Sequence, residues 1–503
     1  MITRITGLRS ARLLRALIFP AAFLLLASTP AVAQDGEEAP PEAAPTPDAA
    51  PEAAPETAPA PTAADERRAA DLRLRLRPVH VIGERPGDLA FIPGSASLIT
   101  EDDLRAYAPR DANQILRTQP GIHVADEEGL GLRLNVGIRG LSPDKSRNVL
   151  ILEDGIPVAL NPYGEPEMYY SPPIERIESI EIVRGHGSIL FGPQTIGGVI
   201  NYRTHAPPEE LTVRSDLRFG SYDYRMGNAS VGDTVGQVGY IVQASHRRFG
   251  GPRNLNLVST DVTSRFRLDL GDRTTADLRF GVYDEISNAT YVGLTTPQFE
   301  TNPRFNFAIY DTLPVRRLSA SATISHLLSD DALLQTTLYG YTVTRNWQRQ
   351  DFDRTPAEGR AYERAFDGQG NRIADLAGAP DDGSGIFFRD STGNRNRSFV
   401  VAGVEPRLTL DWRFANVDNE LTTGLRLHYE YADEQRIDGT HGASRSGVMR
   451  EDQDRTGYAF AAYALNRFII ADRIFLSPGL RMEYLHATRE IYRQRVDGTP
   501  TDL

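Results

Sequence analysis

The feature that most constrains the fold of this chain is an alternation of apolar and polar residues that recurs through residues 208–503. Successive side chains of a β-strand point to opposite faces, so a period of two predicts strands with one apolar face. Segments of roughly ten residues separated by turns are typical of a transmembrane antiparallel β-barrel, and about eleven segments fit this rule. A soluble β-sandwich is the alternative, but the segment lengths and the many charged partners argue against it.

The first of these segments predicts which face meets the membrane. Its apolar positions are Leu211, Val213, Leu217 and Phe219, which alternate with Arg214, Asp216 and Arg218. An arginine on the lipid face costs about 2–4 kcal/mol at the middle of a bilayer. We therefore expect the charged set to face the lumen and the apolar set to face lipid. The mean hydropathy of -0.37 leaves no room for a bundle of membrane-spanning helices.

The connections between the segments differ in length. Turns such as Gly271-Asp272 are short, whereas the connection at about 350–396 is long and rich in Gly, Asp and Arg. Short periplasmic turns and long outer loops are the pattern of outer-membrane barrels. Arg345, Arg349 and Arg354 lie where a strand enters this long connection, and their guanidinium groups are candidates for recognising an anionic ligand by paired hydrogen bonds. Contact with anionic lipid headgroups, or simple solubility, is the alternative.

The N-terminal residues predict export followed by a tether. Residues 1–33 combine a basic start, an apolar run and the small-x-small pattern Ala31-Val32-Ala33, which together indicate a cleaved signal peptide. Residues 34–77 are expected to be a disordered tether, because the stretch 34–66 holds nine acidic residues, eight prolines and no basic residue. A short extended run, Val79-His80-Val81-Ile82, follows directly.

Composition excludes several classes of protein. There is no cysteine, which removes disulfide scaffolds, thiolate metal sites and cysteine nucleophiles. The net charge of -12, without a basic stripe, argues against a nucleic-acid partner. The motifs of zinc peptidases and of serine hydrolases are absent from the sequence. We therefore predict no catalytic residues, no metal site and no enzyme activity.

Residues 84–206 carry the signals of a compact α+β domain. Thr100 and Asp111 are expected to cap two short helices, and Asp154-Gly155 is a two-residue hairpin signal. The predicted strands are 134–138, 149–152, 181–183 and 197–202, and Ile174, Ile177 and Ile180 have the spacing of a helix.

Motifs in this domain resemble the plug domain of TonB-dependent outer-membrane receptors. They are Gly137-Ile138-Arg139-Gly140, Ile151-Leu152-Glu153-Asp154-Gly155-Ile156-Pro157 and Ile180-Glu181-Ile182-Val183-Arg184-Gly185. Within that family, Asn161-Pro162-Tyr163-Gly164-Glu165-Pro166 and the run Gly192-Pro193-Gln194 followed by Gly197-Gly198 look most like the ferric-dicitrate (FecA-like) receptors. The segments of residues 207–503 resemble the family only in their alternation of apolar and polar residues.

The resemblance implies a transmembrane antiparallel β-barrel of about 22 strands with an N-terminal α+β plug domain, residues 84–206, in its lumen. Residues 207–503 would supply about half of that barrel, so the chain is expected to be truncated. The resemblance also implies a location in the outer membrane of a Gram-negative bacterium. Residues 78–83 lie where the family has its TonB box, and an extended peptide on a tether suits strand addition to a partner's sheet edge. Val79, His80, Val81 and Ile82 would then bind TonB, which acts with ExbB/ExbD.

The implied function is active import of an iron chelate, with the ferric chelate as ligand and no resident cofactor. The residues expected to contact it are Leu141, Ser142, Lys145, Tyr163, Glu165 and Glu167 from the plug and Arg345, Arg349 and Arg354 from the barrel. Glu165 and Glu167 replace the glutamines of the ferric-dicitrate receptors and would repel an anionic chelate unless neutralised. Other cargoes, such as cobalamin, another metal chelate or an oligosaccharide, stay open, as does a passive porin-like barrel.

Overall fold

The computed structural model describes residues 94–502, apart from 128–129, 161, 164–168, 186–187, 291, 416, 472–473 and 497–498. The predicted signal peptide, tether and TonB box lie outside the described residues, and so do Glu165 and Glu167. The domain boundaries at residues 33, 77, 83 and 206 stay predictions.

The N-terminal part of the described chain is an α+β unit built on a five-stranded sheet. Its elements are β1 (Ser95–Ile99), α3 (Glu101–Tyr107), α4 (Ala112–Leu116), β2 (Ile122–Val124), β3 (Val136–Ile138), β4 (Val149–Glu153), β5 (Ile156–Pro157), β6 (Ile177–Arg184), α5 (Ser188–Phe191) and β7 (Gly198–Thr204), with single 3-10 turns at Asp144–Ser146 and Ile174–Arg176. The sheet order is β1-β6-β7-β4-β5, and β2 pairs with β3 separately. Only β4 and β7 are parallel.

Local sequence signals explain how these elements begin. Thr100 and Asp103 form a reciprocal capping box on α3, and the Asp111 side chain accepts a hydrogen bond from the Gln114 amide at the start of α4. Asp154 and Gly155 have φ angles of 47° and 80°, which a two-residue hairpin turn requires. The predicted caps and hairpin are therefore confirmed.

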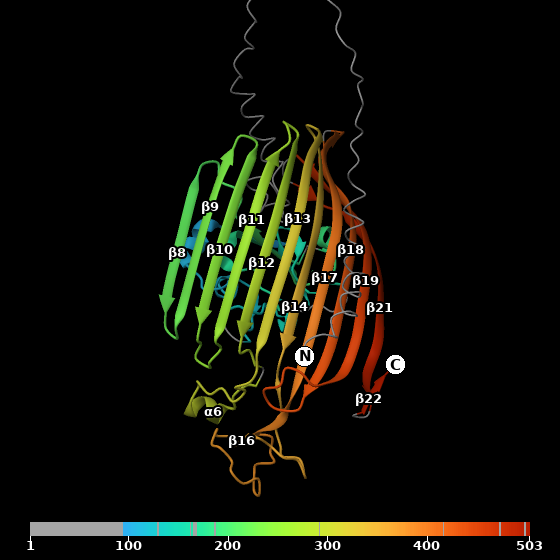
Figure 1. Ribbon diagram of the computed structural model, residues 1–503. Coiled ribbons are helices and arrows are strands. Elements are labelled where there is room, and N and C mark those ends of the chain that lie inside the picture. The colour runs from blue at the N-terminus through green and yellow to red at the C-terminus, as the bar shows by residue number, and fades with distance from the viewer. Residues whose placement is uncertain are drawn as a thin grey trace, which may run out of the picture. The chain divides into compact units, whose positions relative to one another are not determined.

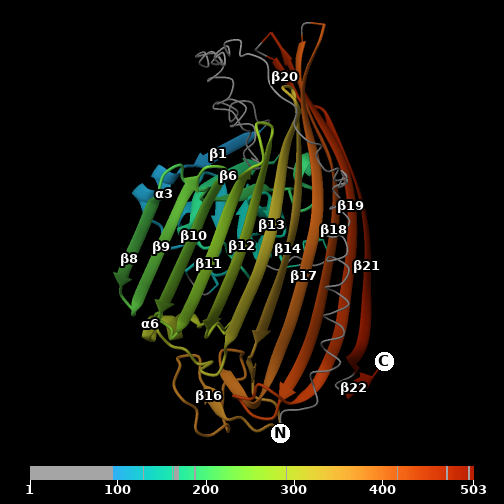
Figure 2. The ribbon, with the colours of Figure 1, turned by 45° about the horizontal axis from the view of Figure 1, so that its top comes forward.

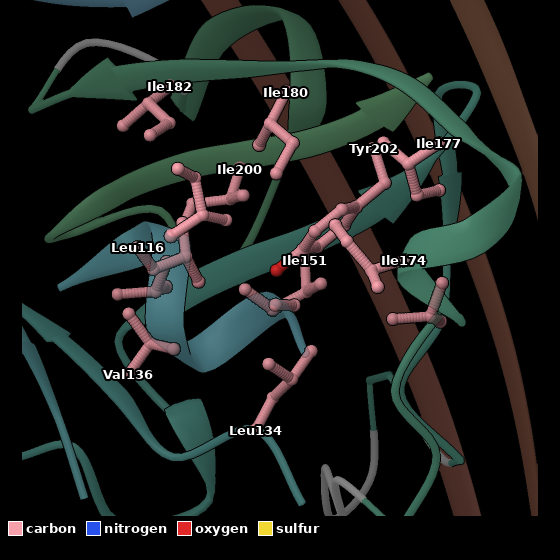
Figure 3. Close-up of a cluster of buried hydrophobic side chains, with 14 of the residues drawn as sticks. Leu116, Leu134, Val136, Ile151, Ile174, Ile177, Ile180, Ile182, Ile200 and Tyr202 are labelled. Carbon is pink, nitrogen blue, oxygen red and sulfur yellow. The ribbon is translucent and has the colours of Figure 1, made fainter. Parts of the chain in front are cut away.

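The helix suggested by the isoleucine spacing is wrong beyond its first turn. Ile174–Arg176 is a single 3-10 turn, and the chain then becomes strand β6. Strand β6 lies between β1 and β7, and seven of its eight residues are buried, so its apolar residues do not alternate. A strand buried on both faces cannot be told from a helix by periodicity alone. Figure 3 shows Ile177, Ile180 and Ile182 packed with Leu116, Ile200 and Tyr202 in the core of this unit.

The rest of the described chain forms one large antiparallel sheet (Figures 1 and 2). Its eleven strands of nine residues or more are β8 (Thr212–Gly220), β9 (Tyr224–Val235), β10 (Val238–Phe249), β11 (Leu257–Asp269), β12 (Thr274–Ser287), β13 (Leu313–Ser329), β14 (Ala332–Trp347), β17 (Ile386–Phe414), β18 (Val417–Gly439), β19 (Val448–Ile470) and β21 (Gly479–Val496). The short strands are β15 (Gln350–Asp353), β16 (Arg364–Phe366), β20 (Ile474–Leu476) and β22 (Thr499–Asp502). Consecutive long strands are neighbours, as in an up-and-down barrel wall.

The alternation separates the two faces of this wall as predicted. Val213 and Phe219 are 73% and 76% exposed on the outer face. On the inner face, Arg214 forms an ion pair with Glu101 of α3 at 3.2 Å, and Arg218 donates to the carbonyl of Pro109 at 2.9 Å. The charged set therefore faces the plug. None of the described helices is long and apolar enough to cross a membrane.

The connections also follow the predicted asymmetry. The turns at 236–237 and 330–331 are short, whereas the connections at 288–312 and 348–385 are long. The long loop predicted at about 350–396 ends earlier, because β17 already begins at Ile386. The first part of β17 is rich in polar residues such as Thr392, which the register pairs with β18. A polar composition that suggests a loop is therefore compatible with a strand here.

The two long connections pack into one structure, which we call the loop cap (residues 288–312 and 348–385). Its core contains Val292, Phe307 and Ala308, which pack with Ile386 and Phe388. The short helix α6 (Thr296–Thr301) ties the two connections together: buried Gln298 donates to the carbonyl of Asp367 at 2.9 Å, and Thr295 donates to that of Gly368 at 2.7 Å.

We expect the loop cap to be more stable at pH 5 than at pH 7. Asp311 is 1% exposed, and burial raises the pKa of its carboxyl group to about 6 although the Gln350 amide donates to it at 2.8 Å. A carboxyl group with a raised pKa favours the folded state when protonated, so this stability is present below about pH 4 and is lost as the pH rises through 6. The full loss is about 3 kcal/mol, of which about 1.4 kcal/mol falls between pH 5 and pH 7.

Hydrogen exchange of residues 288–312 at pH 5 and 7, corrected for the intrinsic pH dependence of exchange, measures this effect. The variant Asp311→Asn should remove the difference between the two pH values. Equal protection of the wild-type protein at both values would contradict the prediction.

Candidate ligand-binding site

The predicted plug contacts at 141–145 form a turn that the plug itself holds in place. The Lys145 amide donates to Asn135 Oδ1 at 2.9 Å, and the Ser146 hydroxyl accepts from the Val136 amide at 2.9 Å and donates to the Leu134 carbonyl at 2.8 Å. Ser142 is exposed, and Leu141 and Lys145 are half-buried. Within the described residues, this turn is not brought together with Tyr163 or with the three predicted arginines.

Tyr163 lies against the inner wall at strands β18 and β21. Its amide donates to Glu430 Oε2 at 3.0 Å, and its hydroxyl donates to Glu483 Oε1 at 3.3 Å. Its ring centroid is 4.9 Å from that of the buried His428. Burial raises the pKa of the Tyr163 hydroxyl, so the group stays a neutral donor. The Pro162–Tyr163 turn is thus anchored to the wall just before the segment that holds Glu165 and Glu167.

Arg345 and Arg349 gather near Tyr169 of the plug and Trp347 of the wall. The Arg345 guanidinium lies 3.8 Å from the ring centroid of Tyr169 and 5.5 Å from that of Trp347, and the Arg349 guanidinium lies 4.7 Å from that of Trp347. Tyr169 and Trp347 meet edge to face at 6.2 Å. We call these four residues the arginine–aromatic site. Arg345 is 2% exposed, so it is held rigidly beside the plug.

Arg354 lies apart from this site, in the loop cap. Its guanidinium stacks on Phe352 at 5.5 Å. The neighbouring Asp353 is engaged within the cap: burial acts to raise its pKa, but hydrogen bonds from Arg389, Tyr362 and Arg360 outweigh burial and lower the pKa to about 2. The structure therefore brings together two of the three predicted arginines.

The structure adds residues that sequence reasoning did not select. Arg133 of the plug lies 5.8 Å from the Tyr169 centroid, and its guanidinium binds Glu285 of β12 at 2.7 Å. Tyr283 donates to the same carboxylate at 2.6 Å. In the sequence, the features that could have indicated these contacts were the pair Tyr169-Tyr170 before Ser171-Pro172-Pro173, and Trp347, one of two tryptophans in the chain.

The arrangement suits a planar or multiply charged anion. A guanidinium stacked on an aromatic ring keeps its N–H edges free to bind oxygen ligands, and each such stack contributes about 0.5–2 kcal/mol that fixes its orientation. Arg133 is paired with Glu285, and the guanidinium groups of Arg345 and Arg349 lie 5.5 Å and 4.7 Å from the Trp347 ring centroid. Among the described residues there is no group of three or more His, Asp and Glu side chains placed to hold a metal ion.

A second set of charged residues joins the plug to the wall, farther from the loop cap than the arginine–aromatic site. Arg176 binds Glu153 at 2.7 Å and Asp261 of β11 at 2.8 Å, and Arg279 of β12 binds Glu153 at 2.7 Å and Asp154 at 2.5 Å. Burial acts to raise the pKa of Glu153, but Arg176 and Arg279 outweigh it and lower the pKa. We call these five residues the plug–wall ion network.

Comparisons with known proteins agree with this architecture. Residues 88–199 match the family described as "TonB-dependent Receptor Plug Domain". The ferric enterobactin receptor PirA of Pseudomonas aeruginosa is 32% identical over 219 residues, which are 39% of this chain and 28% of that protein. The vitamin B12 transporter BtuB of Vibrio cholerae is 30% identical over 144 residues, 29% of this chain and 23% of the transporter.

Solved structures show the same fold. The unliganded ferric citrate transporter FecA superimposes with a TM-score of 0.67 at 21% identity, covering 81% of this chain and 58% of that one. The closed form of the ferric-catecholate import receptor Fiu from Escherichia coli K12 has a TM-score of 0.66 at 14% identity, covering 84% and 60%. The present chain therefore matches less than two thirds of the length of each of these proteins.

These findings confirm the predicted resemblance to TonB-dependent outer-membrane receptors. They also confirm the predicted fold class, a plug with part of an antiparallel transmembrane barrel. The predicted location in the outer membrane and the prediction of a receptor rather than an enzyme are in line with this family.

Proposed function

We propose that this chain, which carries the plug domain and the barrel fold of a TonB-dependent outer-membrane receptor, imports an anionic iron chelate. The chelate binds at the arginine–aromatic site, beside Tyr169 of the plug. TonB, driven by ExbB/ExbD, binds residues 79–82 and loosens the plug, so that the chelate passes. Outer-membrane lipids surround the apolar outer face of the wall.

The observation that carries this proposal is the pair of stacked arginines beside the plug. Arg345 and Arg349 lie next to Trp347, and Tyr169 of the plug contacts Arg345 directly. A bound anion would therefore touch both the wall and the plug, which is what a receptor needs if ligand occupancy is to reach the plug. The names of PirA, FecA and Fiu refer to ferric enterobactin, ferric citrate and ferric catecholates, and these chelates are the first to test.

Cobalamin is the second candidate cargo, because a vitamin B12 transporter is 30% identical to this chain over 144 residues. The arginine–aromatic site favours an iron chelate with several negative charges over this bulkier ligand. A passive porin is disfavoured, because the plug–wall ion network holds a folded domain against the wall inside the lumen.

The variant Arg345→Gln should weaken chelate binding by roughly tenfold or more, because one charged hydrogen bond contributes about 1.5–3 kcal/mol. The measurement is uptake and binding of radio-iron, given as ferric dicitrate and as a ferric catecholate, in cells that express the receptor from its own gene. Arg345→Lys should also weaken binding, because lysine keeps the charge but loses the planar stack.

Arg413→Gln serves as the matched control, because Arg413 is 66% exposed at the opposite end of the wall and pairs only with Asp418 in the described chain. Unchanged binding in Arg345→Gln, with normal amounts of receptor in the outer membrane, would refute the proposed site. Failure of both chelates to bind the wild-type receptor would exclude these cargoes and turn the search to cobalamin.

A further inference from the structure

The inner wall contains a recess of small residues below the arginine–aromatic site. The strand register aligns Thr263 of β11, Gly281 of β12 and Ser319 of β13 in one row across three neighbouring strands. These residues line a small space of about 50 Å³ between the wall and the plug. We call this space the inner recess. The side chains of these three residues are small, and the row continues on β14 at Tyr341, which also lines the space.

Arginines border the recess on two sides along the strands. Arg317 is two residues from Ser319 along β13, on the side of the long loops. The register pairs it with Tyr283 of β12 and Val343 of β14. On the other side of the row, Arg265 is two residues from Thr263 and Arg279 is two residues from Gly281. These two arginines are paired in the register. All three arginines line the recess. Glu153 of the plug also lines the recess, where it is paired with Arg279, so small residues lie between this ion pair and the guanidinium group of Arg317.

Arg317 is the unusual member of this set. It is 5% exposed, and its guanidinium lies 3.7 Å from the Tyr341 centroid and 4.7 Å from that of Tyr170. Its Nη1 atom is buried and has no hydrogen-bond partner in the described part of the chain. A buried guanidinium N–H without a partner is costly and calls for an acceptor. Arg265 and Arg279, in contrast, are paired with Asp277, Glu153 and Asp154.

We propose that the inner recess is a second anion-binding station, at which carboxylate or similar oxyanion groups of the cargo bind between Arg317 and Arg279 after leaving the arginine–aromatic site. The proposal rests on the proposed function for its place in transport, but the anion preference of the recess is a property of the protein alone. The register places Arg345 opposite Val315 and Arg317 opposite Val343, so the two sites lie on adjacent strands, two residues apart.

Occupancy of this station would act on the plug directly. Arg279 binds Glu153 and Asp154 of the plug, at 2.7 Å and 2.5 Å. An oxyanion in the recess competes with these carboxylates for the same guanidinium. When the oxyanion replaces Glu153 or Asp154 at Arg279, one ion pair between the plug and the wall is lost. The cargo itself therefore weakens the plug–wall ion network on this side of the lumen.

The absence of cysteine allows a direct test of the anion preference. The variant Ser319→Cys places a single thiol in the recess, and Ser221→Cys places one in the exposed turn between β8 and β9 as a control. Each full-chain variant, in outer membranes of resting and of transporting cells, is treated with an anionic (sulfonatoethyl) and a cationic (trimethylammonioethyl) methanethiosulfonate of similar size.

We expect the anionic-to-cationic rate ratio at position 319 to exceed that at 221 by at least about tenfold, because a charged hydrogen bond from Arg317 to the anionic reagent contributes about 1.5–3 kcal/mol. Adding Arg317→Gln should reduce the ratio toward the control value. Equal ratios at the two positions, or no reaction at 319 in either kind of membrane, would overturn the proposal. Neither result depends on the identity of the cargo.

Transport provides the second arm. Ser319→Phe fills the recess, whereas Leu318→Phe adds the same ring on the lipid face, where Leu318 is 47% exposed. With the chelate that the wild-type receptor binds, Ser319→Phe should bind it normally but take it up at least about tenfold more slowly, while Leu318→Phe does both normally. Normal uptake in Ser319→Phe would overturn the station and leave the proposed function intact. The proposed function is tested separately, by wild-type binding and uptake and by Arg345→Gln.

Discussion

Replacing Arg176 by methionine is expected to destabilise the docking of the plug against the wall by about 3–5 kcal/mol, since it leaves buried carboxylates without their partner. Arg176 is 5% exposed and joins Glu153 of the plug to Asp261 of β11. Arg279 still compensates Glu153, so the unpaired charge falls mainly on Asp261. Hydrogen exchange of β4 and β6 in the intact membrane protein should report the loss as faster exchange.

Arg105→Met is the matched control. Arg105 is also a plug arginine with two carboxylate partners, Glu101 and Asp102, but it is 67% exposed, and exposed pairs contribute only about 0–1 kcal/mol. The double variant Arg176→Met with Asp261→Leu should recover part of the protection, because it removes the orphaned charge. Equal exchange in Arg176→Met and Arg105→Met would show that the plug–wall ion network does not hold the plug.

Val81→Pro is expected to abolish energised uptake, so that iron accumulation falls to the level of cells without TonB. The reason is the chemistry of strand addition: proline has no amide hydrogen to donate to a partner strand, and it breaks the pairing at the centre of Val79-His80-Val81-Ile82. Binding of the chelate at the cell surface should stay within roughly twofold of wild type, a difference below about 0.5 kcal/mol.

Two controls separate coupling from folding. Val81→Thr keeps the amide and the branched side chain and should transport normally. Ala64→Pro adds a proline to a tether that already contains many, and should also be neutral. Wild-type uptake by Val81→Pro would show that residues 79–82 are not the TonB-binding segment, and the search would move to the first strands of the plug.

Much of the fold could be predicted because its signals are local. The faces of the first barrel segment follow from period two and from the cost of a charge in lipid, and Val213 and Arg214 lie as that argument requires. The caps at Thr100 and Asp111 and the turn at Asp154-Gly155 depend on a few neighbouring residues. The spacing at Ile174–Ile180 misled because β6 is buried on both faces.

The candidate site was predicted only in part. Arg345 and Arg349 were selected from their crowding at the end of a strand, but the aromatic residues Tyr169 and Trp347 could not be assigned to them as stacking partners from the sequence. The turn at 141–145 carries a motif of the same domain, yet its contacts in the described chain are made within the plug. Motif order thus identified the domain without showing which of its turns meets the wall.

By itself, the sequence determined the strand pattern, the lipid-facing side chains and the plug motifs, because each depends on residues that are close together in the sequence. Only the tertiary structure decided which inward-facing charges meet. Arg176 meets Asp261, and Tyr169 meets Arg345, across stretches of chain that carry no common pattern. Inside the lumen an alternating strand can present any polar residue, so the pairing is set by strand register and by how the plug docks, and both are properties of the whole fold.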